Sequence, residues 1–289
     1  MKLSQLFAQK KRTLSFEVFP PKSSTAFESV KKSTLQIASL APAYMSVTYG
    51  AGGTTDGLTT SLAKEILQNG VTPLEHLTCV GSTTQSVISH LETLKKNNIE
   101  NILALRGDIP KDATQRDIDG WCCKYASQLT KLIKDNGDFC VGGACYPEGH
   151  IECENQTKDI ENLKIKVDCG CEFLTTQMFF DNNILYNFLY KIREAHIAVP
   201  VVAGIMPVTN EKQIRRILKI SDTHLPRKFV NMLDRFGSDP ASMKQAGIAY
   251  ATEQIVDLYA NGVNAVHVYS MNNPDVAKRI FDNLSDILR

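Results

Sequence analysis

Short apolar runs alternate along this chain with longer segments of helical periodicity, and the alternation repeats eight times. We expect strands at residues 14–19, 44–48, 75–80, 101–105, 139–145, 173–178, 199–205 and 265–269. We expect helices at residues 26–40, 58–69, 86–97, 122–135, 156–169, 183–196, 211–220 and 248–261, followed by a closing helix from Asp275. Several runs are apolar throughout, as strands are when helices cover both faces of a parallel sheet. The pattern therefore favours an α/β fold with a parallel sheet.

Eight βα units in 289 residues predict a single (β/α)8 TIM barrel that forms one domain over residues 1–289. A doubly wound sheet is the main alternative, but no GxGxxG sequence follows an expected strand. Residues 52–58 are similar to a phosphate-binding loop, yet Leu58 stands where such a loop carries its lysine. Two insertions are expected at the functional end of the barrel. One is an extra helix at residues 227–236 between units 7 and 8, flanked by Pro226 and Gly237, and the other is a long charged loop at residues 109–120.

The charge of the chain is balanced, with 32 Lys and Arg against 31 Asp and Glu, a net charge of +1. A chain without an excess of basic residues lacks the positive charge with which nucleic-acid-binding proteins contact phosphates. Small molecules are therefore the expected ligands. The longest nearly apolar stretch, residues 199–208, is about half as long as a membrane-spanning helix, which needs about 20 residues. The first residues lack the apolar core of a signal peptide. We therefore expect a soluble, cytoplasmic protein without a membrane partner.

The 8 cysteines stand mostly singly within apolar segments, and no CxxC pair occurs. This usage favours reduced thiols that pack as small apolar side chains. The adjacent Cys122 and Cys123, and Cys169 with Cys171, could be metal or redox sites, but neither pair has a second ligand pair at zinc spacing. We therefore expect no metal.

Polar residues gather at the ends of the expected strands. In a barrel, the loops that follow the strands converge on one cavity, which is where the active site lies. The residues at these ends are Glu17, Thr48, Tyr49, Gly50, Gly52, Gly53, His76, Thr78, Arg106, Gly107, Asp108, Tyr146, Glu148, His150, Thr175, Thr176, Gln177, Asp181, Asn182, Pro207, Asn210, Tyr269 and Asn272. They are the candidate functional residues.

Glu17 is the most informative of them, because it lies between Phe16 and Val18 on an expected barrel strand. Burial disfavours the charged form of a carboxyl group and raises its pKa, which suits a proton donor at neutral pH. A buried ion pair with a lysine or arginine is the alternative. Asp108 could likewise be a turn residue that pairs with Arg106. Packing or capping remains the structural alternative for His76, His150, Gln177 and Tyr269.

One expected helix carries a polar face that could hold a nucleotide. Asp159, Asn162 and Lys166 are spaced at i, i+3 and i+7, so they lie on one side of the helix at residues 156–169. An acid, an amide and an ammonium group together can bind a ribose, an adenine edge and a phosphate. The same pattern is also typical of a solvated helix face.

In this order, the strand-end segments resemble the methylenetetrahydrofolate reductase family. The matching segments are FEVFPPK (16–22), SVTYGAGG (46–53), HLTCVG (76–81), NILALRGDIP (101–110), YPEGH (146–150), DxxNLKxKVDCG (159–170), TQMFFDN (176–182), GIMPVTN (204–210) and VHVY (266–269). They are collinear and span nearly the whole chain. The resemblance implies a barrel that binds FAD and reduces 5,10-methylenetetrahydrofolate to 5-methyltetrahydrofolate. It also implies NADH or NADPH as hydride donor, flavin N5 as carrier and ping-pong kinetics, a step in methionine biosynthesis.

The resemblance assigns roles to individual residues. Glu17 matches the general acid that opens the folate ring, and Asp108 matches a carboxylate near flavin and pterin. Gln177 and Thr48 match positions that contact the folate or the nicotinamide. The positions that match FAD contacts are Tyr49, His76, Arg106, Gly107, Asp108, Tyr125, Ala126, Tyr146, His150, Asp159, Asn162 and Lys166.

Three positions depart from the family's usual residues. Ile165 replaces a basic residue, Glu211 replaces an aromatic residue after the PVTN segment, and Asn273 replaces an arginine after the VHVY segment. Two other functions stay open: a pterin methyltransferase barrel without flavin, and a reductase subunit that takes electrons from a partner protein. A homo-oligomer is expected. Control through the regulatory domain of eukaryotic family members is not expected.

Overall fold

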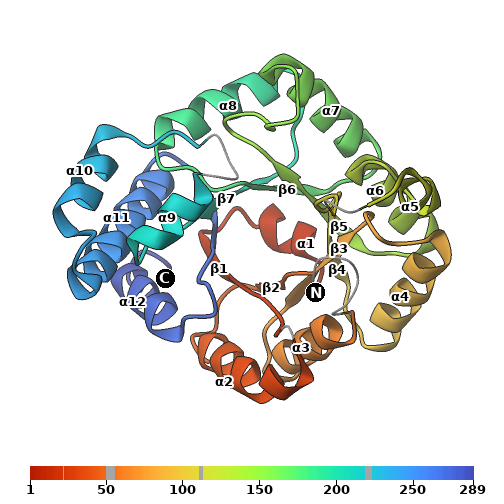
Figure 1. Ribbon diagram of the computed structural model, residues 1–289, viewed down its shortest axis with the longest axis horizontal. Coiled ribbons are helices and arrows are strands. Elements are labelled where there is room, and N and C mark those ends of the chain that lie inside the picture. Colours follow the sequence, from red (N-terminus) through yellow and green to blue (C-terminus); the bar gives the residue numbers. More distant parts are fainter. Residues whose placement is uncertain (22, 50–55, 111–112, 219–222) are drawn as a thin grey trace.

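Eight parallel strands, hydrogen-bonded in chain order, form a closed barrel, because β8 also pairs with β1 (Figure 1). The computed structural model describes residues 1–21, 23–49, 56–110, 113–218 and 223–289. The strands are β1 (Thr13–Val18), β2 (Met45–Val47), β3 (Pro73–Thr78), β4 (Asn101–Leu105), β5 (Cys140–Cys145), β6 (Phe173–Thr176), β7 (Val201–Ile205) and β8 (Ala265–Val268). The predicted (β/α)8 TIM barrel is therefore confirmed.

Helices surround the strands on the outside of the barrel, apart from α1 (Leu3–Ala8) (Figure 1). The others are the short 3-10 helix η1 (Ser24–Ala26), α2 (Phe27–Ala38), α3 (Asp56–Gln68), α4 (Thr84–Lys96), α5 (Gln115–Gly120), α6 (Ala126–Asn136), α7 (Gln156–Asp168), α8 (Asn182–Glu194), α9 (Glu211–Ile217), α10 (Arg227–Phe236), α11 (Pro240–Ala260) and α12 (Pro274–Leu284). The extra helix α10 has its predicted bounds, with Pro226 and Gly237 as its caps.

Several sequence expectations were wrong in detail. Half of the expected loop at residues 109–120 is helix α5, because the Thr114 hydroxyl accepts a hydrogen bond from the Asp117 amide and starts a helical turn. Helix α11 begins before residue 248, since Asp239 caps it and Pro240 occupies its first turn. The expected helix at residues 122–135 starts only at Ala126. Part of the helix expected at residues 211–220 lies outside the described residues.

Helix α1, which the sequence pattern did not predict, lies across one end of the barrel, at the centre of the ring in Figure 1. Leu3 and Phe7 are buried there against Tyr44 and Phe173, and the rings of Phe7 and Phe173 lie 5.2 Å apart. Helix α1 and the apolar side chains packed against it therefore cover this end of the barrel.

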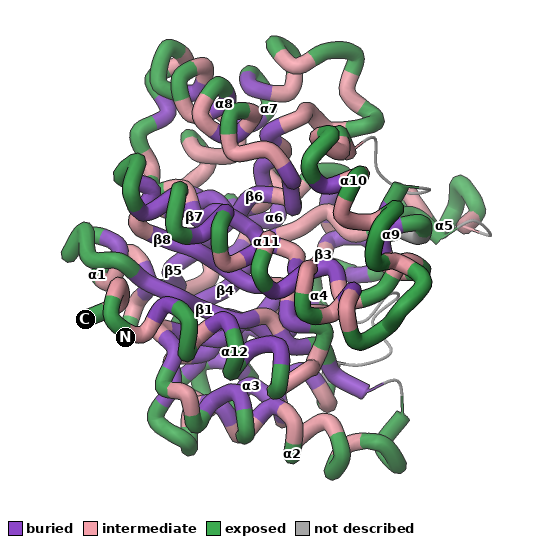
Figure 2. Tube along the Cα trace, turned by 90° about the vertical axis from the view of Figure 1, so that its left-hand side faces the viewer, coloured by how far each residue is buried: buried purple, intermediate pink, exposed green. Residues whose placement is uncertain are grey.

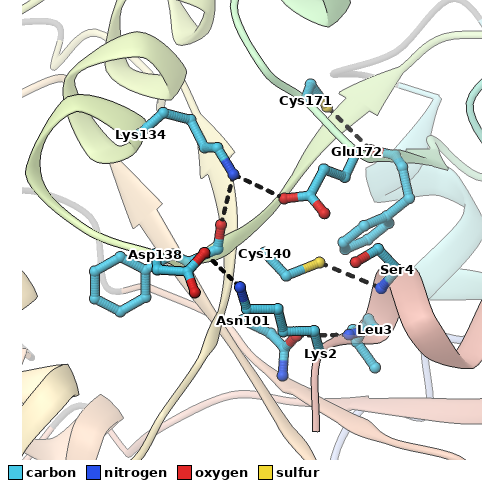
Figure 3. A network of polar contacts seen from close by, with 11 residues as sticks. Lys2, Leu3, Ser4, Asn101, Lys134, Asp138, Cys140, Cys171 and Glu172 are labelled. Atoms are coloured by element: carbon cyan, nitrogen blue, oxygen red, sulfur yellow. Dashed lines mark hydrogen bonds and ion pairs between the residues drawn. The ribbon is translucent and has the colours of Figure 1, made fainter.

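A network of polar contacts fixes α1 to the strands (Figure 3). The Leu3 amide donates to Oδ1 of Asn101 at 2.8 Å, and the Ser4 amide donates to Sγ of Cys140 at 3.3 Å. The ammonium group of Lys2 pairs with Asp138. Because these partners stand at the starts of β4 and β5, the network joins α1 to the barrel end at which strands begin.

Burial follows the layers of the fold (Figure 2). The largest apolar cluster lies between the outer faces of the strands and the inner faces of the helices, with Phe16, Val47, Ile102 and Val266 among its fully buried members. A separate cluster around Phe229 packs α10 against the barrel. None of the helices in the described part of the chain is both long and apolar enough to cross a membrane.

Candidate active site

A pocket of about 1220 Å³ opens at the end of the barrel opposite α1. It is lined by residues from the carboxyl ends of the strands and from the segments that follow them. Every candidate catalytic, substrate or cofactor residue named from the resemblance lines it: Glu17, Thr48, Tyr49, His76, Arg106, Gly107, Asp108, Tyr125, Ala126, Tyr146, His150, Asp159, Asn162, Lys166 and Gln177. Gly50, Gly52 and Gly53 lie outside the described residues. The strand ends thus bring residues as far apart in the sequence as Glu17 and Tyr269 to one cavity.

Glu17 lies inside the barrel with a side chain that is 19% exposed. Removal from water raises the pKa of its carboxyl group to about 8, so the carboxyl carries a proton at neutral pH. Its ionisable contact among the described residues is His76, whose Nε2 is 3.7 Å from Oε2 of Glu17. Burial lowers the pKa of His76 to about 3, so this histidine is neutral as well. The alternative of an ion pair with lysine or arginine is therefore wrong within the described residues.

A buried histidine lies deeper in the barrel. His267 forms hydrogen-bonding contacts to Ser15 through Nδ1 at 2.8 Å and to Ser46 through Nε2 at 2.9 Å. Ser15 itself donates to the Val266 carbonyl, so Nδ1 of His267 donates to Ser15 and Nε2 accepts from Ser46. The ring of Tyr44 stacks on His267 at 5.4 Å. This neutral network places no cation beneath Glu17.

Arg106, Gly107 and Asp108 follow β4 at the pocket wall. Arg106 forms its ion pair with Glu152 rather than with Asp108, so the expected pairing of Asp108 is wrong. Gly107 has a φ of 86°, and a Cβ atom there would lie 3.1 Å from Cβ of Thr78. Both the backbone conformation and the close approach require glycine at this position. The chain therefore passes close to β3 and leaves Asp108 at the pocket.

Helix α7 presents its predicted polar face to the pocket. Asp159 accepts a hydrogen bond from the His150 amide at 3.2 Å, and Lys166 donates to the Ala144 carbonyl at 2.6 Å. Burial raises the pKa of Asp159 and lowers the pKa of Lys166. The alternative of a purely solvated face is therefore wrong for these two residues. The ring of Tyr146 meets His150 edge-on at 4.6 Å beside them.

Thr48 and Tyr49 line the pocket after β2, and Gln177 lines it after β6. The Gln177 amide continues the sheet by donating to the Cys145 carbonyl at 2.8 Å, and its side chain lines the pocket. The ring of Tyr49 lies edge-on to His90 at 6.2 Å. The Tyr269 hydroxyl donates to the Thr176 carbonyl at 2.6 Å. This contact agrees with the packing or capping role that was the structural alternative for Tyr269.

The three departures from the family's usual residues have local structural roles. Asn273 caps α12 by accepting from the Val276 amide at 3.3 Å. Glu211 opens α9 and pairs with Arg215. Ile165 is 53% exposed on α7 and lines the pocket.

Sequence reasoning missed Glu152 and His267 as members of the pocket wall. His267 stands two positions before Tyr269, so the alternation of side chains along a strand could have placed both inside the barrel. No comparable signal exists for Glu152, which lies in an irregular segment after β5.

The chemistry of the pocket suits an organic ligand rather than a metal. Two buried polar atoms in its wall, Nε2 of His76 and Oγ1 of Thr175, have no hydrogen-bond partner within the protein. Buried polar atoms are rarely left in this state, so they mark contacts for a ligand. Among the described residues, no cluster of three or more His, Cys, Asp or Glu side chains has the arrangement of a metal site. All 8 cysteines are free thiols.

A closed barrel with a large pocket of mixed polar and apolar lining, and with a protonated carboxyl group on its wall, is typical of an enzyme that acts on a large organic ligand. Comparison with known proteins identifies its family. The family model described as methylenetetrahydrofolate reductase matches residues 2–285. The chain therefore belongs to the methylenetetrahydrofolate reductase family, as its motifs predicted.

Similar proteins come from bacteria and plants. The chain is 33% identical over 272 residues to the 5,10-methylenetetrahydrofolate reductase of Escherichia coli, covering 94% of this chain and 90% of that protein. It is also 33% identical over 272 residues to the enzyme of the same name from Pectobacterium carotovorum, with 94% and 89% covered. Methylenetetrahydrofolate reductase (NADH) 1 of Arabidopsis thaliana is 34% identical over 298 residues, but only 50% of that protein is covered.

One solved structure supports the fold alone. A protein from Clostridium thermocellum, described as uncharacterized and as binding two copies of 5-methyl-5,6,7,8-tetrahydrofolic acid, has a TM-score of 0.68 and 13% sequence identity, and covers 100% of this chain and 99% of that one.

Proposed function

We propose that this protein reduces 5,10-methylenetetrahydrofolate to 5-methyltetrahydrofolate, with FAD as cofactor and NADH as hydride donor. The observation that carries the proposal is the Glu17 carboxyl group, which is protonated at neutral pH and lines a pocket of about 1220 Å³. Family membership supplies the substrate class. The name of the similar Arabidopsis protein favours NADH over NADPH as the donor.

The residues present fit the flavin dinucleotide. The pocket combines the cations of Arg106 and Lys166 with aromatic, amide and carboxylate groups, which suit phosphates, hydroxyl groups and a flat ring. We assign the cofactor contacts to Tyr49, His76, Arg106, Gly107, Asp108, Tyr125, Ala126, Tyr146, His150, Asp159, Asn162 and Lys166. A bound flavin would supply reversible hydride acceptance at N5.

Glu17 supplies the proton that the reaction consumes. The methylene carbon of the substrate accepts a hydride readily only after its bond to one ring nitrogen opens, and protonation of that nitrogen drives the opening. A carboxyl group that keeps its proton at pH 7 is suited to donate it there. Asp108 stabilises the resulting cation by its negative charge, and Gln177 and Thr48 orient the folate and the nicotinamide in turn.

Each half-reaction can be followed separately by anaerobic stopped-flow spectroscopy. NADH should bleach the bound flavin without folate present, and methylenetetrahydrofolate should then restore the flavin absorbance, as ping-pong kinetics require. A purified protein that binds no FAD would refute the proposal and favour the methyltransferase alternative. Flavin that only dithionite bleaches would point instead to a partner protein as the electron donor.

A further inference from the structure

Arg106 and Glu152 form a two-point ion pair between the segments that follow β4 and β5. Nη1 of Arg106 donates to Oε2 of Glu152, and Nη2 donates to Oε1 at 2.8 Å. On its other side, Nε of Arg106 donates to the carbonyl oxygen of Gly107 at 3.3 Å. A guanidinium group is planar and carries its five N–H groups in fixed directions, so contacts at two edges fix the whole group.

The ion pair leaves part of Arg106 available to a ligand. Each terminal nitrogen of a guanidinium group carries two N–H groups, and Glu152 accepts one from each nitrogen. Arg106 lines the pocket with a side chain that is 25% exposed, while the Glu152 side chain is 56% exposed. The more exposed carboxylate therefore holds the less exposed cation at the pocket wall.

The segment that carries Glu152 is fixed by contacts that do not use its carboxylate. The Glu152 amide donates to Nδ1 of His150 at 3.1 Å, and the His150 amide donates to Asp159. The Cys153 amide donates to the His150 carbonyl at 2.8 Å. A glutamine at position 152 would keep these contacts, and would lose only the charge that holds Arg106.

We propose that Glu152 is a positioning residue that orients Arg106 so that its remaining N–H groups meet oxygen atoms of the bound flavin nucleotide. This inference rests on the proposed function, because it takes FAD as the ligand. Without the carboxylate, the long arginine side chain has more conformations to lose when the ligand binds, and that loss weakens binding.

A double-mutant cycle tests the inference through the dissociation constant for FAD, measured by quenching of flavin fluorescence. Glu152→Gln should weaken FAD binding about threefold to tenfold, the cost of ordering one free arginine side chain. Arg106→Gln should weaken it further. The double variant should bind FAD as Arg106→Gln does, because Glu152 has no effect once its partner is gone.

Glu253→Gln is the matched control, since it removes the same charge and breaks an exposed ion pair with Lys228, and neither residue lines the pocket. Its affinity for FAD should equal that of the wild type. Additive effects in the cycle would overturn the inference, because Glu152 would then act independently of Arg106. Tighter binding by Glu152→Gln would also overturn it, since the carboxylate would then compete with the ligand. A wild-type protein without affinity for FAD would refute the proposed function itself.

Discussion

The raised pKa of Glu17 comes from the neutrality of its surroundings. His76 from β3 and His267 from β8 both have a pKa of about 3, so neither carries a charge at neutral pH. Tyr44 is buried and Tyr269 is half-buried nearby, and removal from water raises the pKa of both hydroxyl groups. With no cation to stabilise its ionised form, the carboxyl group keeps its proton until about pH 8.

This environment predicts the pH dependence of flavin reoxidation by the folate. The reactive form of Glu17 is the protonated one, so the rate should be constant at neutral pH and fall tenfold per pH unit above about pH 8. Glu17→Gln cannot donate the proton and should lower this rate by about 10²–10⁴-fold, while NADH still bleaches the flavin. Stopped-flow traces across the pH range measure both effects. An equal loss in both half-reactions of the variant would contradict the acid role.

The same pKa predicts how Glu17 affects stability. Its ordinary pKa is 4.5, and the folded protein raises it to about 8, so between these values the folded state holds a proton that the unfolded state has lost. Stability from this group is therefore complete below pH 4.5 and falls as pH rises to about 8. Relative to the wild type, the stability of Glu17→Gln should increase by on the order of 3 kcal/mol between pH 5 and pH 8. Urea unfolding at both pH values tests this, and an equal difference at the two values would contradict it.

At the level of elements, α1 closes the barrel end at which the strands begin. Phe7 is 8% exposed and packs against Tyr44 and Phe173. Phe7→Ala should therefore lower the free energy of unfolding by about 3–4 kcal/mol, the usual cost of deleting a buried aromatic ring. Tyr190→Ala is the control, because Tyr190 is 64% exposed on α8, and it should change stability by less than about 0.5 kcal/mol. Urea unfolding of both variants compares them. Equal losses would show that α1 does not contribute to the core.

Helices and strands with strong apolar periodicity could be predicted from the sequence. A helix held by contacts with distant residues, or a helix start set by a capping residue, could not. The eight strands follow from the repeated alternation of short apolar runs with helical segments, and α10 follows from Pro226 and Gly237. Helix α1 has only 6 residues and is held by packing and by contacts with distant strands, so its own sequence carries little signal. Helix α11 starts early because Asp239 caps it, and a capping residue leaves no mark on the apolar periodicity.

The candidate site was predictable to the extent that it lies at strand ends. Glu17, His76 and Gln177 were expected at the ends of strands. Because the parallel strands of a barrel all end on the same side, this expectation alone places the three residues in one cavity. The partner of each residue was not predictable. Arg106 could have met Asp108 two positions away, and its actual partner, Glu152, is 46 residues distant.

At the scale of the whole molecule, FAD should stabilise the folded protein. The pocket takes residues from most of the βα units, and none of this arrangement exists in the unfolded chain, so the cofactor binds only the folded state. An FAD concentration of about 100 times the dissociation constant should add about 2.7 kcal/mol to the free energy of unfolding. Thermal unfolding at increasing FAD concentrations measures this. A melting temperature that does not depend on FAD would contradict the proposed cofactor.

Both ends of the chain lie toward the α1 side of the molecule, while α5 and α9 lie on the opposite side (Figure 2). A tether attached to either end would therefore turn the pocket away from its support. The protein could be coupled to a sensor surface or fused to a fluorescent reporter through its amino or carboxyl terminus, and small molecules would still reach the pocket directly from solution.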